Sequence, residues 1–174
     1  TIIEAKAVQD LTSFNLDFIG FEISRIAVND APAQFERSGQ ELTITPAAQL
    51  VEDESFVIQV DYTGSPTRIV SKAHPFQIGW VNFDGGSFVM SEPDGSASFY
   101  PVNDHPLDKS TYTFRVTVPE PFEVAANGVV VETIPTAGTN TFLFEVREPM
   151  ASYLTSINIG EFDVETMETA NGIP

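Results

Sequence analysis

The sequence predicts an all-β fold made of mostly antiparallel sheets. Three observations support it. Apolar side chains recur at every second position, and turn-forming residues separate these runs. No segment that is long enough for a helix has the apolar spacing of an amphipathic helix. The 12 prolines of the chain would also interrupt most helices. The spacing of the turns predicts about a dozen short strands.

Each predicted strand has apolar side chains on one face and polar side chains on the other, as in half-buried strands of antiparallel sheets. Turn signals such as NDAP, RSGQ, YTGSP, FDGG, EPDG and TAGTN separate the strands. In chain order, the apolar faces consist of Phe14, Leu16 and Phe18; Phe56, Ile58, Val60 and Tyr62; Tyr112, Phe114, Val116 and Val118; Phe142, Phe144 and Val146; and Tyr153, Thr155, Ile157 and Ile159.

The strongest single turn signal is Asn127-Gly128, between the apolar segments FEVAA and VVVE. A two-residue type I′ turn needs positive φ at both central residues, and Asn and Gly are the residues that tolerate it best. We therefore expect a β-hairpin at this point.

The composition fits one domain over residues 1–174, because a hydrophobic content of 42% is enough for a core. No apolar run approaches the roughly 18 residues of a membrane-spanning helix, so we expect no membrane insertion. The chain has 25 acidic and 8 basic side chains, a net charge of -17, which argues against nucleic acid or an anionic membrane as a partner. The acidity fits solubility or a saline habitat, or else a cationic ligand such as a substrate with a free amine.

Neither histidine has the sequence neighbours of a metal ligand. His74 in SKAHPF and His105 in NDHPL each stand alone, whereas a zinc site needs three or four ligands, usually with a close pair in sequence. Proline follows both, which favours loops where the imidazole makes local hydrogen bonds. There is no cysteine, and DGSASFYPVND lacks the ligand spacing of an EF-hand loop. We predict no metal site in this chain.

The sequence also contains no complete catalytic set. The serines at 91, 96 and 98 lack the G-x-S-x-G context of a nucleophile. Glu92 could be paired with Asp94 or Asp104 as a carboxylate couple, but any acidic chain permits such pairings. We therefore predict no catalytic residue in this chain.

Glu92 is the most informative single acid. It follows the predicted strand GSFVM and precedes the turn PDG, so its side chain is expected at a strand end. Strand ends and loops often carry binding groups because the rigid sheet positions them. The alternative is a solvated carboxylate that only caps the turn.

A series of motifs runs through the second half of the chain: Val89-Met90-Ser91-Glu92-Pro93, Tyr100-Pro101-Val102-Asn103-Asp104-His105-Pro106, Lys109, Val118-Pro119 and Ala126-Asn127-Gly128. In this order and spacing they resemble the N-terminal domain of the aminopeptidase N-like (gluzincin) zinc metallopeptidases, which include leukotriene A4 hydrolase. That family has T-Q-x-E-P, F-P-C-x-D-E-P, a lysine, a strand ending in V-P, and S/A-N-G. PMASYLTSINIGEFDV is similar to its closing M-S-x-Y-L strand, so the likeness extends over about residues 10–165.

The resemblance implies a saddle-shaped, mostly antiparallel β domain that packs against a catalytic domain of the same chain, expected after residue 174. The zinc motif H-E-x-x-H of the family would lie in that catalytic domain, so zinc is expected in the parent protein and no cofactor in this piece. The parent would be a zinc aminopeptidase that removes N-terminal residues from peptides, and this piece alone would be inactive.

The resemblance also implies a role for Glu92, whose family counterpart helps to bind the free α-amino group of the substrate. A carboxylate paired with an ammonium group lets an exopeptidase recognise the N-terminus by its charge. Met90 stands where the family has glutamine, and it cannot offer the same amide hydrogen bonds. We expect Asp104 to be structural and to accept backbone N–H bonds in its own Asp-His-Pro turn. The other acids of this polar stretch are expected to face the substrate and the catalytic domain.

Two alternatives remain open at this point. A free-standing β-sandwich could bind carbohydrate on an aromatic platform of Trp80, Phe99 and Tyr100. Alternatively, the chain could come from a family member that has kept the fold and lost catalysis.

Overall fold

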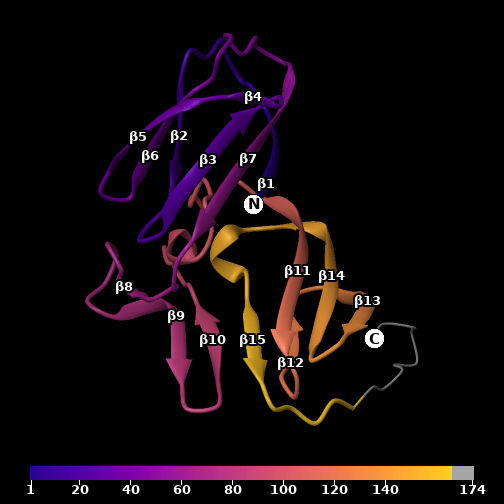
Figure 1. The fold of residues 1–174 in the computed structure, drawn as a ribbon. Helices are drawn as coiled ribbons and strands as arrows, with labels where there is room; N and C mark the ends of the chain where they lie inside the picture. Colours follow the sequence, from indigo (N-terminus) through magenta and orange to yellow (C-terminus); the bar gives the residue numbers. More distant parts are fainter. Residues whose placement is uncertain (166–174) are drawn as a thin grey trace.

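The computed structural model describes residues 1–165, which form β-strands and two short 3₁₀-helices (Figure 1). All strand pairs in this range are antiparallel, which confirms the predicted fold class. None of its helices has the length and apolar character needed to cross a membrane. The elements are β1 (Ile2–Lys6), β2 (Phe14–Asp17), β3 (Glu22–Val28), β4 (Ala31–Pro32), β5 (Gln34–Ser38), β6 (Glu41–Thr45), β7 (Ser55–Thr63), β8 (Arg68–Val70), β9 (Gln77–Phe83), β10 (Gly86–Met90), η1 (Ser96–Ser98), β11 (Ser110–Pro119), β12 (Glu123–Ala126), β13 (Val129–Thr136), β14 (Thr139–Met150), η2 (Ser152–Leu154) and β15 (Ile157–Gly160).

The N-terminal half consists of two sheets and contains the larger core. One sheet has the strand order β1-β7-β3-β4 and the other has β2-β6-β5; both lie at the top of Figure 1. The core includes the buried side chains of two predicted alternating runs, Leu16 and Phe18 from the first and Phe56, Ile58 and Val60 from the second. Alternation therefore predicted which face of these strands is buried.

The C-terminal half contains the other two sheets. One has the strand order β12-β15-β10-β9-β8 and the other has β11-β14-β13. A smaller core of Val118, Val124, Phe142 and Phe144 packs the three-stranded sheet against β12 and β15. The β8–β10 end of the five-stranded sheet lies away from that core, on the other side of β15 (Figure 1).

The hairpin prediction at Asn127-Gly128 is wrong. β12 pairs with β15 and β13 pairs with β14, so this dipeptide carries the chain from one sheet to another. Only Gly128 has positive φ, 89°, and the Asn127 side chain accepts a hydrogen bond from the backbone N–H of Ser156. Contacts with distant segments thus override the local turn preference. The dipeptide Asn29-Asp30 has the φ values of a type I′ turn, 48° and 63°, and joins β3 to β4.

Gly128 should tolerate no side chain. Besides its positive φ, a Cβ atom at this position would overlap the backbone carbonyl of Glu145. We expect Gly128→Ala to lower the free energy of unfolding by about 2–3 kcal/mol, measured by urea denaturation. Gly138 is the matched control, since its φ is +79° but nothing lies within 4 Å of the added Cβ; Gly138→Ala should cost about 1 kcal/mol. Equal losses in the two variants would contradict this account of the crossover.

The last predicted strand begins later than its alternation indicates. Tyr153 belongs to η2 and Thr155 follows it, so the ladder with β12 starts only at Ile157. The Thr155 hydroxyl donates to the carbonyl oxygen of Ser152 at 2.7 Å, and its backbone N–H donates to the same atom at 2.9 Å. A threonine that bonds to its local backbone favours a turn over a strand, and this is why the prediction for Tyr153 and Thr155 is wrong.

Candidate functional site

Glu92 lies where the sequence predicted, just beyond the end of a strand. β10 ends at Met90, Ser91 is buried, and Glu92 is exposed at the following turn. Beside it is a groove of about 680 Å³. The groove is lined by Arg68, His74, Phe76, Gln77, Ile78, Met90, Glu92 and Pro93. The structure therefore brings the two predicted site residues, Met90 and Glu92, together in one groove.

The groove combines a carboxylate with exposed apolar surface. Within residues 1–165, Glu92 takes part in no ion pair. Phe76 is 67% exposed and Met90 is 49% exposed, although large apolar side chains are usually buried. Such an arrangement can bind an organic cation, because the carboxylate attracts its charge and the apolar side chains cover its hydrocarbon part.

Asp94 holds the segment 71–76, which supplies His74 and Phe76 to the groove. Its two carboxylate oxygens accept hydrogen bonds from the Ser71 hydroxyl at 2.5 Å and from the backbone N–H of Lys72 at 2.7 Å. Both carboxylate oxygens of Asp94 therefore have partners within this chain. The sequence carried no signal for this contact, because Ser71 and Asp94 are 23 positions apart and belong to no common motif.

Asp104 ties together the two halves of the molecule. One carboxylate oxygen accepts the backbone N–H groups of Ser96 and Ala97 at 3.1 and 3.4 Å, and the other accepts the Ser152 hydroxyl at 2.7 Å. Its own backbone N–H donates to the Asp17 carboxylate at 3.1 Å. The prediction that Asp104 is structural is correct, but its partners are η1 and η2 and not its own Asp-His-Pro turn.

The environment of Asp104 also changes its acidity. Burial raises the pKa of the Asp104 carboxyl above its ordinary value, and the nearby charge of Asp17 adds to this rise in pKa. The hydrogen bonds from Ser152, Ala97 and Ser96 act in the opposite direction and offset part of the increase. In the folded chain this carboxyl therefore holds its proton to a higher pH than an exposed aspartate does.

Both histidines make the local hydrogen bonds that the sequence predicted. The Nδ1 atom of His74 accepts the backbone N–H of Phe76 at 3.3 Å, and that of His105 accepts the N–H of Leu107 at 3.2 Å. In the part of the chain that the structure describes, no three His, Asp or Glu side chains gather as a metal site would require. These residues therefore do not fit a zinc ion.

The other candidates from the sequence are buried or half-buried. Ser91, Ser96 and Ser98 are buried, and the Ser98 hydroxyl donates to the carbonyl oxygen of Gly95. The proposed aromatic platform is also wrong: Phe99 is only 8% exposed, and burial raises the pKa of the Tyr100 phenol. Trp80 and Tyr100 are half-buried, and Phe99 packs against both, with its ring centroid 5.9 Å from that of Trp80 and 4.8 Å from that of Tyr100. The buried Phe99 ring therefore has no free face for a sugar.

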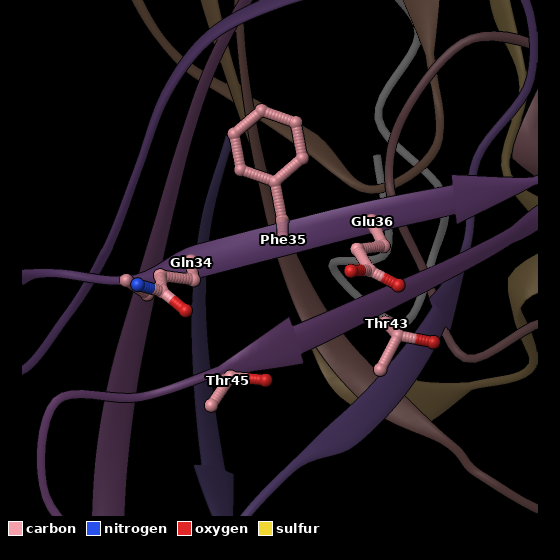
Figure 2. Close-up of a pocket in the computed structure, with 6 residues that line it drawn as sticks. Gln34, Phe35, Glu36, Thr43 and Thr45 are labelled. Atoms are coloured by element: carbon pink, nitrogen blue, oxygen red, sulfur yellow. The ribbon is translucent and has the colours of Figure 1, made fainter.

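A second groove lies on the N-terminal half, over β5 and β6 (Figure 2). Its volume is about 530 Å³, and the Phe35 ring points to the opposite side of β5 from Glu36 (Figure 2). None of the residues singled out from the sequence belongs to its lining. The lining consists of Ala33, Gln34, Phe35, Glu36, Thr43 and Thr45.

Comparison with known proteins identifies the family. A family model described as the Peptidase M1 N-terminal domain matches residues 1–154. This chain belongs to that family. The resemblance inferred from motif order is therefore confirmed.

The relatives of this M1 N-terminal domain are longer proteins. The domain is 26% identical over 180 residues to leucine aminopeptidase 2 of Neurospora crassa, covering 92% of this chain and 25% of that enzyme. It is 26% identical over 136 residues to aminopeptidase B of Rattus norvegicus, covering 73% of this chain and 19% of that enzyme.

Solved structures show the same fold. The M1 zinc metallopeptidase from Deinococcus radiodurans superimposes with a TM-score of 0.85 at 30% identity, covering 91% of this chain and 36% of that one. A variant of that enzyme, solved with a bound Tyr-Ser-Ala substrate, superimposes with a TM-score of 0.84 over the same share of each chain. This chain thus spans about a third of the length of these structures.

Proposed function

We propose that the complete protein carrying this domain is a zinc-dependent aminopeptidase, and that Glu92 binds the α-ammonium group of the first residue of a peptide substrate. The observation that carries this proposal is the exposed Glu92 carboxylate, which has no ion-pair partner within residues 1–165 and lines a groove together with apolar side chains. The relatives support it, because leucine aminopeptidase 2 and aminopeptidase B act on N-termini according to their names.

Recognition of the N-terminus follows from charge. A free ammonium group and the Glu92 carboxylate form a charge-assisted hydrogen bond, which is shorter and stronger than a neutral one. A peptide with a blocked terminus offers no cation, so it would leave the carboxylate desolvated and without a partner. The domain thereby selects substrates that begin at the groove, which is what removal of single N-terminal residues requires.

The domain itself supplies binding and no hydrolytic step. The zinc ion, which provides a Lewis acid for hydrolysis when bound, would be held by another part of the complete protein, because the residues described here do not fit it. We further propose that the groove faces that catalytic part, with the peptide between them.

The complete protein should release tyrosine from Tyr-Ser-Ala, lose this activity when a chelator removes the metal, and regain it with Zn²⁺. N-acetylated Tyr-Ser-Ala should react at least about 100-fold more slowly, since the unpaired carboxylate opposes its binding. Release of amino acids can be followed by chromatography. Equal rates for the free and acetylated peptides would contradict N-terminal recognition, and cleavage of neither peptide would favour a family member that has lost catalysis.

A further inference from the structure

We propose that the segment 71–76, fixed by Asp94, is a preformed wall of the groove, and that Phe76 on this wall contacts the side chain of the first substrate residue and favours large apolar residues. This inference rests on the proposed function and names one substrate preference of the same site. Phe76 would be a specificity-determining residue. Asp94 and Ser71 would be positioning residues that act through it.

Side-chain hydrogen bonds hold the wall in place. Residues 71–76 form no strand or helix, so no ladder of backbone bonds fixes them. Instead, the Ser71 hydroxyl accepts the backbone N–H groups of Ala73 and His74 at 3.0 and 3.3 Å while it donates to Asp94. Asp94 in turn binds the N–H of Lys72. Three consecutive amides are thus organised around one hydroxyl and one carboxylate.

A backbone hydrogen bond also joins the two ends of the segment. The backbone N–H of Ser71 donates to the carbonyl oxygen of Phe76 at 3.1 Å, and Ser71 is only 7% exposed. Phe76 is followed directly by β9, which begins at Gln77 and pairs with both β8 and β10. The wall therefore has a fixed position relative to β10, the strand that ends at Met90.

The wall presents the exposed ring of Phe76 to the groove. The rings of His74 and Phe76 pack against each other with centroids 4.9 Å apart, and the His74 Nδ1 atom accepts the N–H of Phe76. The Phe76 ring is thereby supported on one side and exposed on the other. A large apolar side chain that is fixed and exposed in a groove is a typical ligand-binding feature.

The position of the wall would bring it close to the first side chain of the substrate. Phe76, Met90 and Glu92 line the same groove. A peptide whose ammonium group is bound by Glu92 has its first side chain attached one carbon away, so that side chain lies within the same groove. Leucine would bury apolar surface against Phe76 and Met90, whereas alanine is too short to do so to the same extent. In an apolar pocket, a single missing methylene group lowers kcat/KM by about 10- to 200-fold.

The test measures kcat/KM of the complete protein for leucine p-nitroanilide and alanine p-nitroanilide. Phe76→Ala and Asp94→Ala should each lower the leucine-to-alanine ratio by about 10-fold, with the alanine value changed by less than about 3-fold. Matched controls are Phe83→Ala, which removes an exposed ring at the end of β9, and Asp84→Ala, which removes an exposed acid; neither residue lines the groove. Both controls should keep the ratio.

Hydrogen exchange followed by mass spectrometry tests the fixed wall independently of activity. In Asp94→Ala, the amides of residues 72–74 should exchange at least about 10-fold faster than in the wild type. Lys72 loses its acceptor, and the Ser71 hydroxyl, which accepts from Ala73 and His74, is no longer held by Asp94. Unchanged exchange would overturn the role of Asp94. Because Phe76→Ala alters only an exposed side chain, it tests the specificity claim even if Asp94→Ala does not fold.

Different kinetic results would contradict the proposed function and this inference. If the wild-type protein hydrolyses neither anilide, the proposed function fails and this inference with it. If the wild type is active and the loss of Glu92 impairs it, but Phe76→Ala keeps the leucine-to-alanine ratio or lowers both values equally, the inference alone is overturned.

Discussion

Replacing Glu92 by glutamine in the complete protein should lower kcat/KM for peptides with a free N-terminus by about 10- to 150-fold, as expected for the loss of a charged hydrogen bond. Glutamine keeps the size and shape of the side chain, so the groove stays intact and only the charge is removed. The same change should have little effect on the acetylated peptide, which never forms the ion pair. The ratio between the two substrates should therefore fall. Steady-state kinetics with both peptides measures it.

Glu120 provides the matched control for this variant. It is exposed and, like Glu92, precedes a proline, but it does not line the groove. Glu120→Gln removes the same charge from the same protein and should leave kcat/KM unchanged. If the two variants lose activity equally, the effect of Glu92 comes from overall charge or folding, and its assignment to the substrate amine is wrong.

Replacing Asp104 by alanine should lower the free energy of unfolding of the chain by about 2–4 kcal/mol, because two backbone N–H groups and a hydroxyl lose their acceptor. These donors belong to η1 and η2, so the loss would remove the link that the carboxylate makes between these two segments. Asp104→Asn should cost only about 1 kcal/mol, since an amide oxygen can still accept the N–H groups. Urea denaturation of both variants measures the difference. Equal losses would contradict the hydrogen-bonding role.

The difference in stability between the wild type and Asp104→Asn should change with pH in one direction. Because the pKa of Asp104 is raised above its ordinary value of 3.8 in the folded chain, the folded state binds this proton more tightly than the unfolded state does. The resulting stabilisation is fully present below pH 3.8 and is lost as the pH rises through the raised pKa. The stability of the wild type relative to Asp104→Asn should therefore fall over this interval. A rise would mean that the hydrogen bonds to the carboxylate outweigh its burial.

The sequence was sufficient to predict the strands in which alternation alone decides which side chains are buried. Leu16, Phe18, Ile58 and Val60 are buried, because a period of two places them on one face wherever the strand lies. The order of motifs also identified the family, and the predicted strand GSFVM placed Glu92 at a strand end, where the structure has it. These features are encoded within short segments of the chain.

The errors arose where distant segments decide the local structure. Asn127-Gly128 connects two sheets instead of forming a hairpin, because it contacts Ser156 and Glu145. No local pattern reveals these contacts. The same holds for Asp94, which binds a segment 22 and 23 positions away. The wall of the candidate groove thus could not be predicted, whereas its carboxylate could.

The most direct test of the central claim is a crystal structure of the complete protein with a bound peptide. The claim predicts that the nitrogen of the substrate α-amino group lies about 2.7–3.2 Å from a carboxylate oxygen of Glu92, the range of a hydrogen bond. A structure in which other groups hold that amine, while Glu92 points into solvent or lies on a face away from the peptide, would contradict it.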